Sequence, residues 1–168
     1  MPEIVLIAHN LRSCHNVGSL LRTADGLGVK EVILSGYTPY PHSGLTNTDD
    51  DRLPHEAARL HKQIQKTALG AESSQAWKHV ADVNEIIDEL RSQGYQIAAI
   101  EQSDTSISLP EYTVSDKVAL LVGREVEGVE PEILQQMDTI LEIPMFGKKE
   151  SFNVVQAAAM GLYHCRFG

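Results

Sequence analysis

The stretch IVLIAHNLRSCHNVGSLLRTADGLG, residues 4–28, joins a strand pattern to a helix pattern and decides the fold class. Ile4–Ala8 is apolar at every position, which is typical of a strand buried on both faces of a parallel sheet. Apolar residues then recur at helical spacing on one face: Val17, Leu20, Leu21, Ala24 and Leu27. Gly28 follows at a position where glycine ends many helices. The stretch therefore predicts a strand followed by a helix.

The same alternation continues along the chain. Four more short apolar runs predict buried strands: Glu31–Leu34, Ile97–Ile100, Val118–Val122 and Ile140–Ile143. A second helix is expected between Asp82, which can cap its first turn, and Gly94, which ends it. Gly36–Pro54, rich in Pro, Gly, Thr and Asp, is expected to form a long surface loop. Strands that alternate with helices indicate an α/β domain with a mostly parallel sheet.

Length and charge limit the function classes. The chain has 168 residues and a mass of 18.5 kDa, which fits a single domain over residues 1–168. It carries 14 Lys and Arg against 23 Asp and Glu, a formal net charge of -9. Such a chain has no bulk attraction to polyanions, so any contact with nucleic acid must come from a local basic patch.

The sequence favours a cytoplasmic protein. Cys14 and Cys165 are too few for a disulfide framework, which fits a reducing compartment. No basic N-terminal segment precedes an apolar run, and no apolar stretch approaches the roughly 20 residues that span a bilayer. The histidines lack H-x-x-H or H-E-x-x-H spacing, so no metal site is expected.

Three segments place polar residues and glycines at the ends of buried elements, where open α/β sheets hold their ligands. In Asn16–Ala24, Asn16 can cap the helix. Arg22 of this segment either extends to solvent from an apolar face or holds a phosphate. Leu121–Gly128 is either a tight turn or a point where the backbone approaches a ligand. It lacks the Lys-Ser/Thr of a P-loop, which argues against a nucleoside triphosphatase.

The third segment, Ile143–Met160, leads into an apolar, Ala-rich helix. Ser151 and Asn153 stand at its start, where such residues are usually caps. Lys148 and Lys149 precede them, so the entrance to a buried helix presents a hydroxyl, an amide and two cations. This combination favours a functional site.

In this order, the three segments resemble the three motifs of the SpoU family of RNA ribose methyltransferases, within the SPOUT superfamily. The matching patterns are N-x-G-x-x-x-R at Asn16–Arg22, G-x-E-x-x-G at Gly123–Gly128 and I-P-M-x-G-x-x-x-S-x-N at Ile143–Asn153. The resemblance implies a mostly parallel sheet flanked by helices, with a deep trefoil knot in the C-terminal segment. Knots are rare exceptions among folds, so periodicity could not predict this one.

The resemblance also implies a cofactor and a reaction. S-adenosylmethionine would lie in the knot, against backbone and apolar surfaces near Gly123, Ile143, Met145 and Phe152. The family usually has Leu where this chain has Phe152. The reaction is the displacement of the sulfonium methyl by a ribose 2′-hydroxyl, the group that distinguishes RNA from DNA.

Residue roles follow from the same resemblance. The family residue that matches Arg22 is implicated in activating the hydroxyl, yet a guanidinium is a poor base. We therefore expect Arg22 to clamp the adjacent phosphate and order the hydroxyl, with that phosphate or Ser151 relaying the proton. Asn16 and Glu125 would orient Arg22 and the motif loops, and Asn153 would brace the site.

Family members are usually homodimers in which the arginine comes from the partner subunit, so a homodimer is expected. The phosphate contacts expected first are Arg22, Arg12, Lys148 and Lys149; Arg124 and the face of Arg59, Lys62 and Lys66 are further candidates. The chain resembles a bare catalytic domain without an accessory RNA-binding domain. Its minimal size favours tRNA over rRNA as substrate, with an auxiliary protein supplying further affinity.

Three other interpretations remain open to test. A non-catalytic module that binds cofactor or RNA would share the fold, although the retained Arg22, Glu125, Ser151 and Asn153 argue against it. A base methyltransferase is disfavoured because the Asn-to-Arg spacing belongs to the ribose branch. A dinucleotide-dependent oxidoreductase needs G-x-G-x-x-G after the first strand, and His9–Ser13 does not supply it.

Overall fold

The computed structural model, which describes residues 1–42 and 50–168, contains one seven-stranded sheet in the order β3-β2-β1-β6-β4-β7-β5. Every strand pair in it is parallel. The strands are β1 (Glu3–His9), β2 (Glu31–Ser35), β3 (Trp77–Val80), β4 (Gln96–Ile100), β5 (Ile107–Ser108), β6 (Lys117–Val122) and β7 (Thr139–Glu142). Parallel strands require crossover connections, and helices supply most of them.

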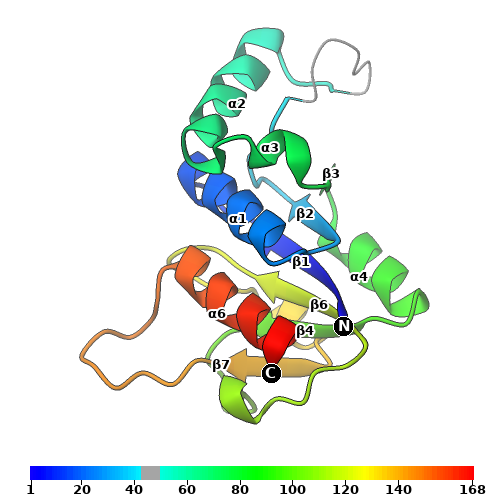
Figure 1. The fold of residues 1–168 in the computed structure, drawn as a ribbon, viewed down its shortest axis with the longest axis vertical. Helices are drawn as coiled ribbons and strands as arrows, with labels where there is room; N and C mark the ends of the chain where they lie inside the picture. Colours follow the sequence, from blue (N-terminus) through cyan, green and yellow to red (C-terminus); the bar gives the residue numbers. More distant parts are fainter. Residues whose placement is uncertain (43–49) are drawn as a thin grey trace.

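Helices cover both faces of the sheet (Figure 1). The helices are α1 (Cys14–Gly26), α2 (Pro54–Ala68), α3 (Ala71–Ser74), α4 (Val83–Ser92), α5 (Pro131–Leu134) and α6 (Val154–Phe167), and a 3-10 turn η1 spans Leu109–Glu111. One apolar core lies between the sheet and α1, α2, α3 and α6, and a second lies between the sheet and α4 and α5. Both faces of the central strands are buried, which explains their unbroken apolar runs.

Most of the sequence prediction for the fold is confirmed. The five predicted strands are present within one or two residues, although β7 ends at Glu142 and leaves Ile143 outside it. Helices α1, α4 and α6 are also present. The prediction that Asn16 caps α1 is wrong, because the helix begins at Cys14 and the Ser13 side chain accepts the Asn16 N–H.

The region from β2 to α4 was predicted least well. Helix α2 was missed, since it buries only Ala57, Ile64 and Ala68 and has a weak apolar pattern. The short elements α3, β3 and β5 were missed as well. Of the predicted loop Gly36–Pro54, residues 36–42 and 50–53 form no helix or strand, and residues 43–49 lie outside the described residues.

The described residues contain neither a membrane-spanning helix nor a cluster of metal ligands. In the described ranges, 1–42 and 50–168, no helix has both the length and the apolar character needed to cross a membrane. Within those same ranges, no three His, Cys, Asp or Glu side chains gather in a way that could hold a metal ion. Cys14 and Cys165 are buried free thiols, and burial raises the pKa of Cys165 to about 11.

Gly18, the glycine of the first motif, allows α1 to pack closely against α2. A Cβ at this position would lie 2.3 Å from the Ile64 carbonyl oxygen and 2.9 Å from the Ala68 nitrogen. Both atoms are backbone, so neither can turn aside as a side chain would. Gly18 is therefore explained by helix packing, because the absence of a side chain lets α2 lie directly beside α1.

We expect Gly18→Ala to lower the free energy of unfolding by about 3 kcal/mol, because the helices must separate to admit the methyl group. Gly26→Ala is the matched control on the same helix, since nothing lies within 4 Å of its added Cβ. It should raise stability by about 0.5–1 kcal/mol through helix propensity. Urea denaturation of both variants measures the difference, and equal stabilities would contradict the packing argument.

Candidate functional site

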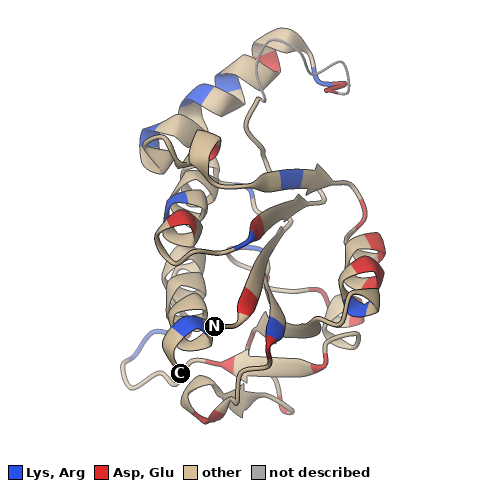
Figure 2. Cartoon of the chain, turned by 45° about the vertical axis from the view of Figure 1, so that its right-hand side comes forward, with Lys and Arg blue, Asp and Glu red and all other residues tan. Residues whose placement is uncertain are grey.

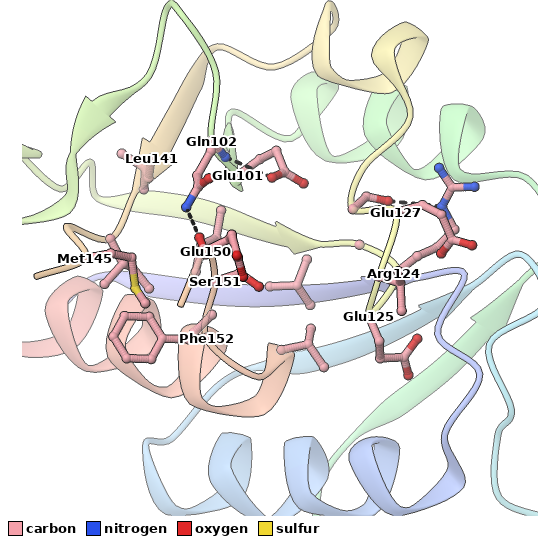
Figure 3. Close-up of a pocket in the computed structure, with 18 residues that line it drawn as sticks. Glu101, Gln102, Arg124, Glu125, Glu127, Leu141, Met145, Glu150, Ser151 and Phe152 are labelled. Atoms are coloured by element: carbon pink, nitrogen blue, oxygen red, sulfur yellow. Dashed lines mark hydrogen bonds between the residues drawn. The ribbon is translucent and has the colours of Figure 1, made fainter. Parts of the chain in front are cut away.

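A pocket of about 270 Å³ lies at the carboxyl ends of β6, β4 and β7, which are neighbours in the sheet (Figure 3). Segments that follow these strands form its walls: Glu101–Gln102, Gly123–Gly128, Ile143 and Met145. Glu150–Phe152, just before α6, completes the lining. Open α/β sheets place their ligand sites at this edge.

The pocket combines apolar walls with negative charge. The apolar lining consists of Ile100, Val122, Leu141, Ile143, Met145, Phe152, Val154 and Ala157. Four glutamates also line it: Glu101, Glu125, Glu127 and Glu150. Arg124 also lines the pocket, so the lining carries more negative than positive charge and suits a ligand that combines an apolar group with positive charge.

The turn 123–128 on one wall is held by a backbone hydrogen bond and by the side chain of Arg124. Gly128 N donates to Arg124 O at 3.1 Å, and Arg124 Nε donates to Gly128 O at 3.1 Å. A Cβ on Gly123 would lie 2.8 Å from the Gly128 carbonyl carbon and 2.8 Å from Val129 N. Glycine at 123 is therefore required by the closure of the turn itself.

Glu125 connects this turn to the start of α1. Its carboxylate accepts from Arg12 N at 3.2 Å, from Ser13 N at 3.1 Å and from the Asn16 Nδ2 at 3.3 Å. A carboxylate at a helix N-terminus meets unpaired N–H groups and the positive end of the helix dipole. The second motif is thereby fastened to the first.

The environment of Glu125 favours its ionised form. Burial alone would raise the pKa of this carboxyl. Hydrogen bonds from its own backbone, from Ser13 and Arg12 and from the Asn16 amide outweigh burial and hold the pKa below its usual value. The contact is therefore strongest when Glu125 carries its charge.

Arg22 lies outside the pocket of its own chain. It is exposed on α1, well beyond Asn16 along the helix, and it makes no hydrogen bond or ion pair within the part of the chain that the structure describes. The structure therefore brings Asn16 to Glu125 but brings neither residue to Arg22.

The third motif is divided between the pocket and the helix cap. Ser151 and Phe152 line the pocket, as do Ile143 and Met145. Asn153 instead caps α6, with its Oδ1 accepting from Val155 N at 2.9 Å. Its placement is that of an ordinary N-cap at the edge of the site.

Of the residues expected to meet RNA, Arg12, Lys148 and Lys149 lie next to segments that line the pocket, whereas Arg22 does not. Lys148 and Lys149 are exposed in the segment between β7 and α6, and Phe146 of the same segment is 98% exposed. Arg12 is exposed beside the pocket turn, where its Nη2 lies 3.2 Å from Glu127 Oε1.

The sequence analysis did not predict two polar residues that line the pocket, Glu101 and Gln102. Glu101 accepts from Val129 N at 3.0 Å through Oε2 and supports the 123–128 turn. Gln102 donates from Nε2 to Glu150 O at 2.6 Å and holds the segment before α6. Their position directly after the apolar run Ile97–Ile100 is the signal that could have identified them.

Comparison with known proteins gives the family. The profile of the SpoU rRNA methylase family matches residues 43–163, well over half of the chain. A tRNA (guanosine(18)-2′-O)-methyltransferase of Aquifex aeolicus is 27% identical over 98% of this chain and 69% of its own length. A 23S rRNA (guanosine-2′-O-)-methyltransferase of Neisseria meningitidis is 29% identical over 98% of this chain and 58% of its own.

Comparison with solved structures finds the same fold in methyltransferases. A crystal structure of an AdoMet-bound rRNA methyltransferase from Sinorhizobium meliloti superposes with a TM-score of 0.79 at 22% identity, over 98% of this chain and 56% of that one. The chain thus spans between roughly half and two-thirds of the length of these relatives. It belongs to the SpoU rRNA methylase family, a class with a mostly parallel sheet flanked by helices.

We expect Glu125→Gln to lower the free energy of unfolding by about 1–2 kcal/mol at pH 7, because a neutral amide accepts more weakly from these donors. A carboxyl whose pKa is lowered by folding contributes stability above its unfolded pKa of about 4.3. That contribution is lost as pH falls through the folded pKa, so the difference in stability between the two proteins should be smaller at pH 3 than at pH 7.

The control is Glu127→Gln in the same turn, whose carboxylate pairs with exposed Arg12 and with no other side chain of residues 1–42 and 50–168. It should change stability by less than about 0.5 kcal/mol at either pH. Chemical denaturation at pH 7 and pH 3 measures both variants. If Glu125→Gln lowers the free energy of unfolding by the same amount at pH 7 and pH 3, the contact does not depend on the charge of Glu125.

Proposed function

We propose that this protein is an S-adenosylmethionine-dependent RNA methyltransferase that methylates a ribose 2′-hydroxyl. The observation that carries the proposal is the single pocket formed by the second and third motifs and fastened through Glu125 to the first. The names of the tRNA and rRNA relatives support this activity. A non-catalytic cofactor- or RNA-binding module of the same fold is the alternative.

The pocket fits the proposed cofactor. Ile143, Met145 and Phe152 provide apolar surface for an adenine ring, and the turn at Gly123 exposes backbone beside it. The lining carboxylates complement a ligand with cationic sulfonium and ammonium groups. S-adenosylmethionine supplies a methyl group bonded to positively charged sulfur, which an oxygen nucleophile can displace.

Catalysis then needs a group that orders the ribose. Arg22 clamps the phosphate next to the target nucleotide and aligns the 2′-hydroxyl, since its guanidinium is suited to phosphate and poorly suited to accept a proton. That phosphate or the Ser151 hydroxyl relays the proton. Asn16 and Glu125 hold the motif loops in place, and Asn153 braces the site by capping α6.

The position of Arg22 supports a homodimer. Arg22 is remote from its own pocket, so a second copy supplies it to complete the site. Tyr163 and Phe167 on α6 are 60% and 64% exposed, with ring centroids 4.8 Å apart. Helix α6 packs beside α1, so this apolar surface and Arg22 lie on neighbouring helices.

RNA is the proposed substrate, with tRNA favoured over rRNA. Lys148, Lys149 and Arg12 lie around the pocket and contact phosphates, and the exposed Phe146 ring offers a surface on which a base can stack. An auxiliary protein adds affinity that a chain of net charge -9 lacks.

We also propose that the C-terminal segment forms a trefoil knot. Two features support it: β7 is inserted between β4 and β5, and the chain then passes the 123–128 turn to reach α6, which packs on β6, β1 and β4. Residues 1–168 act as one catalytic domain, and the two free thiols support a reducing, cytoplasmic setting.

The proposal is tested by incubating the protein with labelled S-adenosylmethionine and unmodified tRNA or rRNA, followed by nucleoside analysis. We expect a 2′-O-methylated nucleoside in the tRNA fraction. Cofactor binding without transfer to either RNA, even with cell extract added to supply a partner, would favour the non-catalytic module.

A second experiment tests the shared site. Arg22→Ala should abolish transfer without weakening cofactor binding, and Met145→Lys should block the pocket while leaving Arg22 intact. When the two inactive variants are refolded together, about half of the dimers contain one copy of each. Each mixed dimer holds one complete site out of two, so the mixture should regain about a quarter of the wild-type rate. No recovery in the mixture would show that Arg22 acts within its own chain.

A further inference from the structure

Most cations of this acidic protein are already occupied by its own groups. The described residues pair Arg12, Lys30, Arg52, Lys78, Arg91 and Arg124 with carboxylates. Arg166 and Lys117 donate to backbone carbonyls. Within residues 1–42 and 50–168, the cations without such partners are Arg22, Arg59, Lys62, Lys66, Lys148 and Lys149.

Three of these free cations form a stripe on α2. Arg59, Lys62 and Lys66 are separated by three and four residues, so they share one face of the helix over about 10 Å. All three are exposed, and the buried residues Ala57 and Ile64 lie on the opposite face. We call these three residues the α2 stripe.

The α2 stripe has little acidic charge on its own helix, and Glu72 of α3, which accepts from Gln65 of α2, is buried. Helix α2 has a single acidic residue, Glu56, in its first turn. Acidic side chains instead gather on α4, which covers the other face of the sheet and carries Glu85, Asp88 and Glu89 (Figure 2). In a chain of net charge -9, the stripe is therefore a patch where a polyanion is attracted.

The stripe also lies on the side of the sheet that carries Arg22. Helices α1 and α2 pack closely at Gly18, and both cover the same core. A strand of RNA held along α2 thus lies beside the helix that presents Arg22. Lysines are depleted in protein interfaces and enriched against phosphates, which favours RNA over a protein partner.

We infer that the α2 stripe binds the phosphate backbone of the substrate RNA at nucleotides away from the methylated one. The inference rests on the proposed function for the identity of the RNA. Each cation neutralises one phosphate and releases counterions, so the stripe raises affinity for any sequence and makes binding strongly dependent on salt.

The test compares Arg59→Gln/Lys62→Gln/Lys66→Gln with wild type in binding to fluorescein-labelled total tRNA from 50 to 200 mM salt. The steepness of the fall of log affinity with log salt should decrease by about 2.1 to 2.7 for three lost phosphate contacts. Over this range wild type should lose about 20- to 40-fold more affinity than the variant. The matched control, Lys30→Gln/Lys78→Gln/Lys117→Gln, removes three cations that are already engaged and should leave the slope unchanged.

The outcomes separate this inference from the proposed function. Cofactor binding and sedimentation establish that each variant is folded and has the wild-type mass. If the wild-type protein binds tRNA and the stripe variant binds it with a smaller salt dependence, the inference is supported. This holds even where no methyl group is transferred. If the salt slope of the stripe variant equals that of wild type, the inference is wrong even where wild type methylates RNA. It is also wrong if the salt slope of the control variant decreases as much as that of the stripe variant. A change of mass without a change of slope overturns it in favour of a protein contact.

Discussion

The contact between Glu125 and the first turn of α1 is the interaction on which the site depends. It joins a turn that follows β6 to a helix that follows β1, and these strands are adjacent and parallel. Because the N–H groups at a helix start have no partner within the helix, the carboxylate meets a need that the fold itself creates. The pocket wall is thereby fixed to the core without a ligand.

This arrangement also explains the motif glycines. Gly18 brings α2 against α1, and Gly123 lets the pocket turn close on Val129. Neither glycine needs a ligand to account for it. Their physical role is to place α1 and the 123–128 turn so that Glu125 reaches the helix start. The first two motifs are therefore one structural unit built from distant parts of the chain.

Sequence patterns predicted the central strands because burial on both faces leaves a continuous apolar run, as at Val118–Val122. They failed at α2, where exposed cations occupy one face and only three residues are buried. Pocket residues Gly123, Glu125, Ile143, Met145, Ser151 and Phe152 were found through the motif resemblance. Glu101 and Gln102 were missed because their role depends on contacts with segments far along the chain.

The proposed function would require the protein to bind a cationic donor and a polyanion together, and the charge distribution bears on how it could do so. Carboxylates around the pocket favour the donor, yet they repel RNA phosphates at the same place. The free cations lie outside the pocket lining, on α1, on α2 and in the β7–α6 segment, an arrangement that would let both ligands bind. Since screening limits each patch to roughly 8–10 Å in physiological salt, the patches act locally and do not cancel one another. The pocket's own arginine, Arg124, is already engaged with Gly128 O and Glu130, so in the proposed site a free guanidinium has to come from outside the pocket.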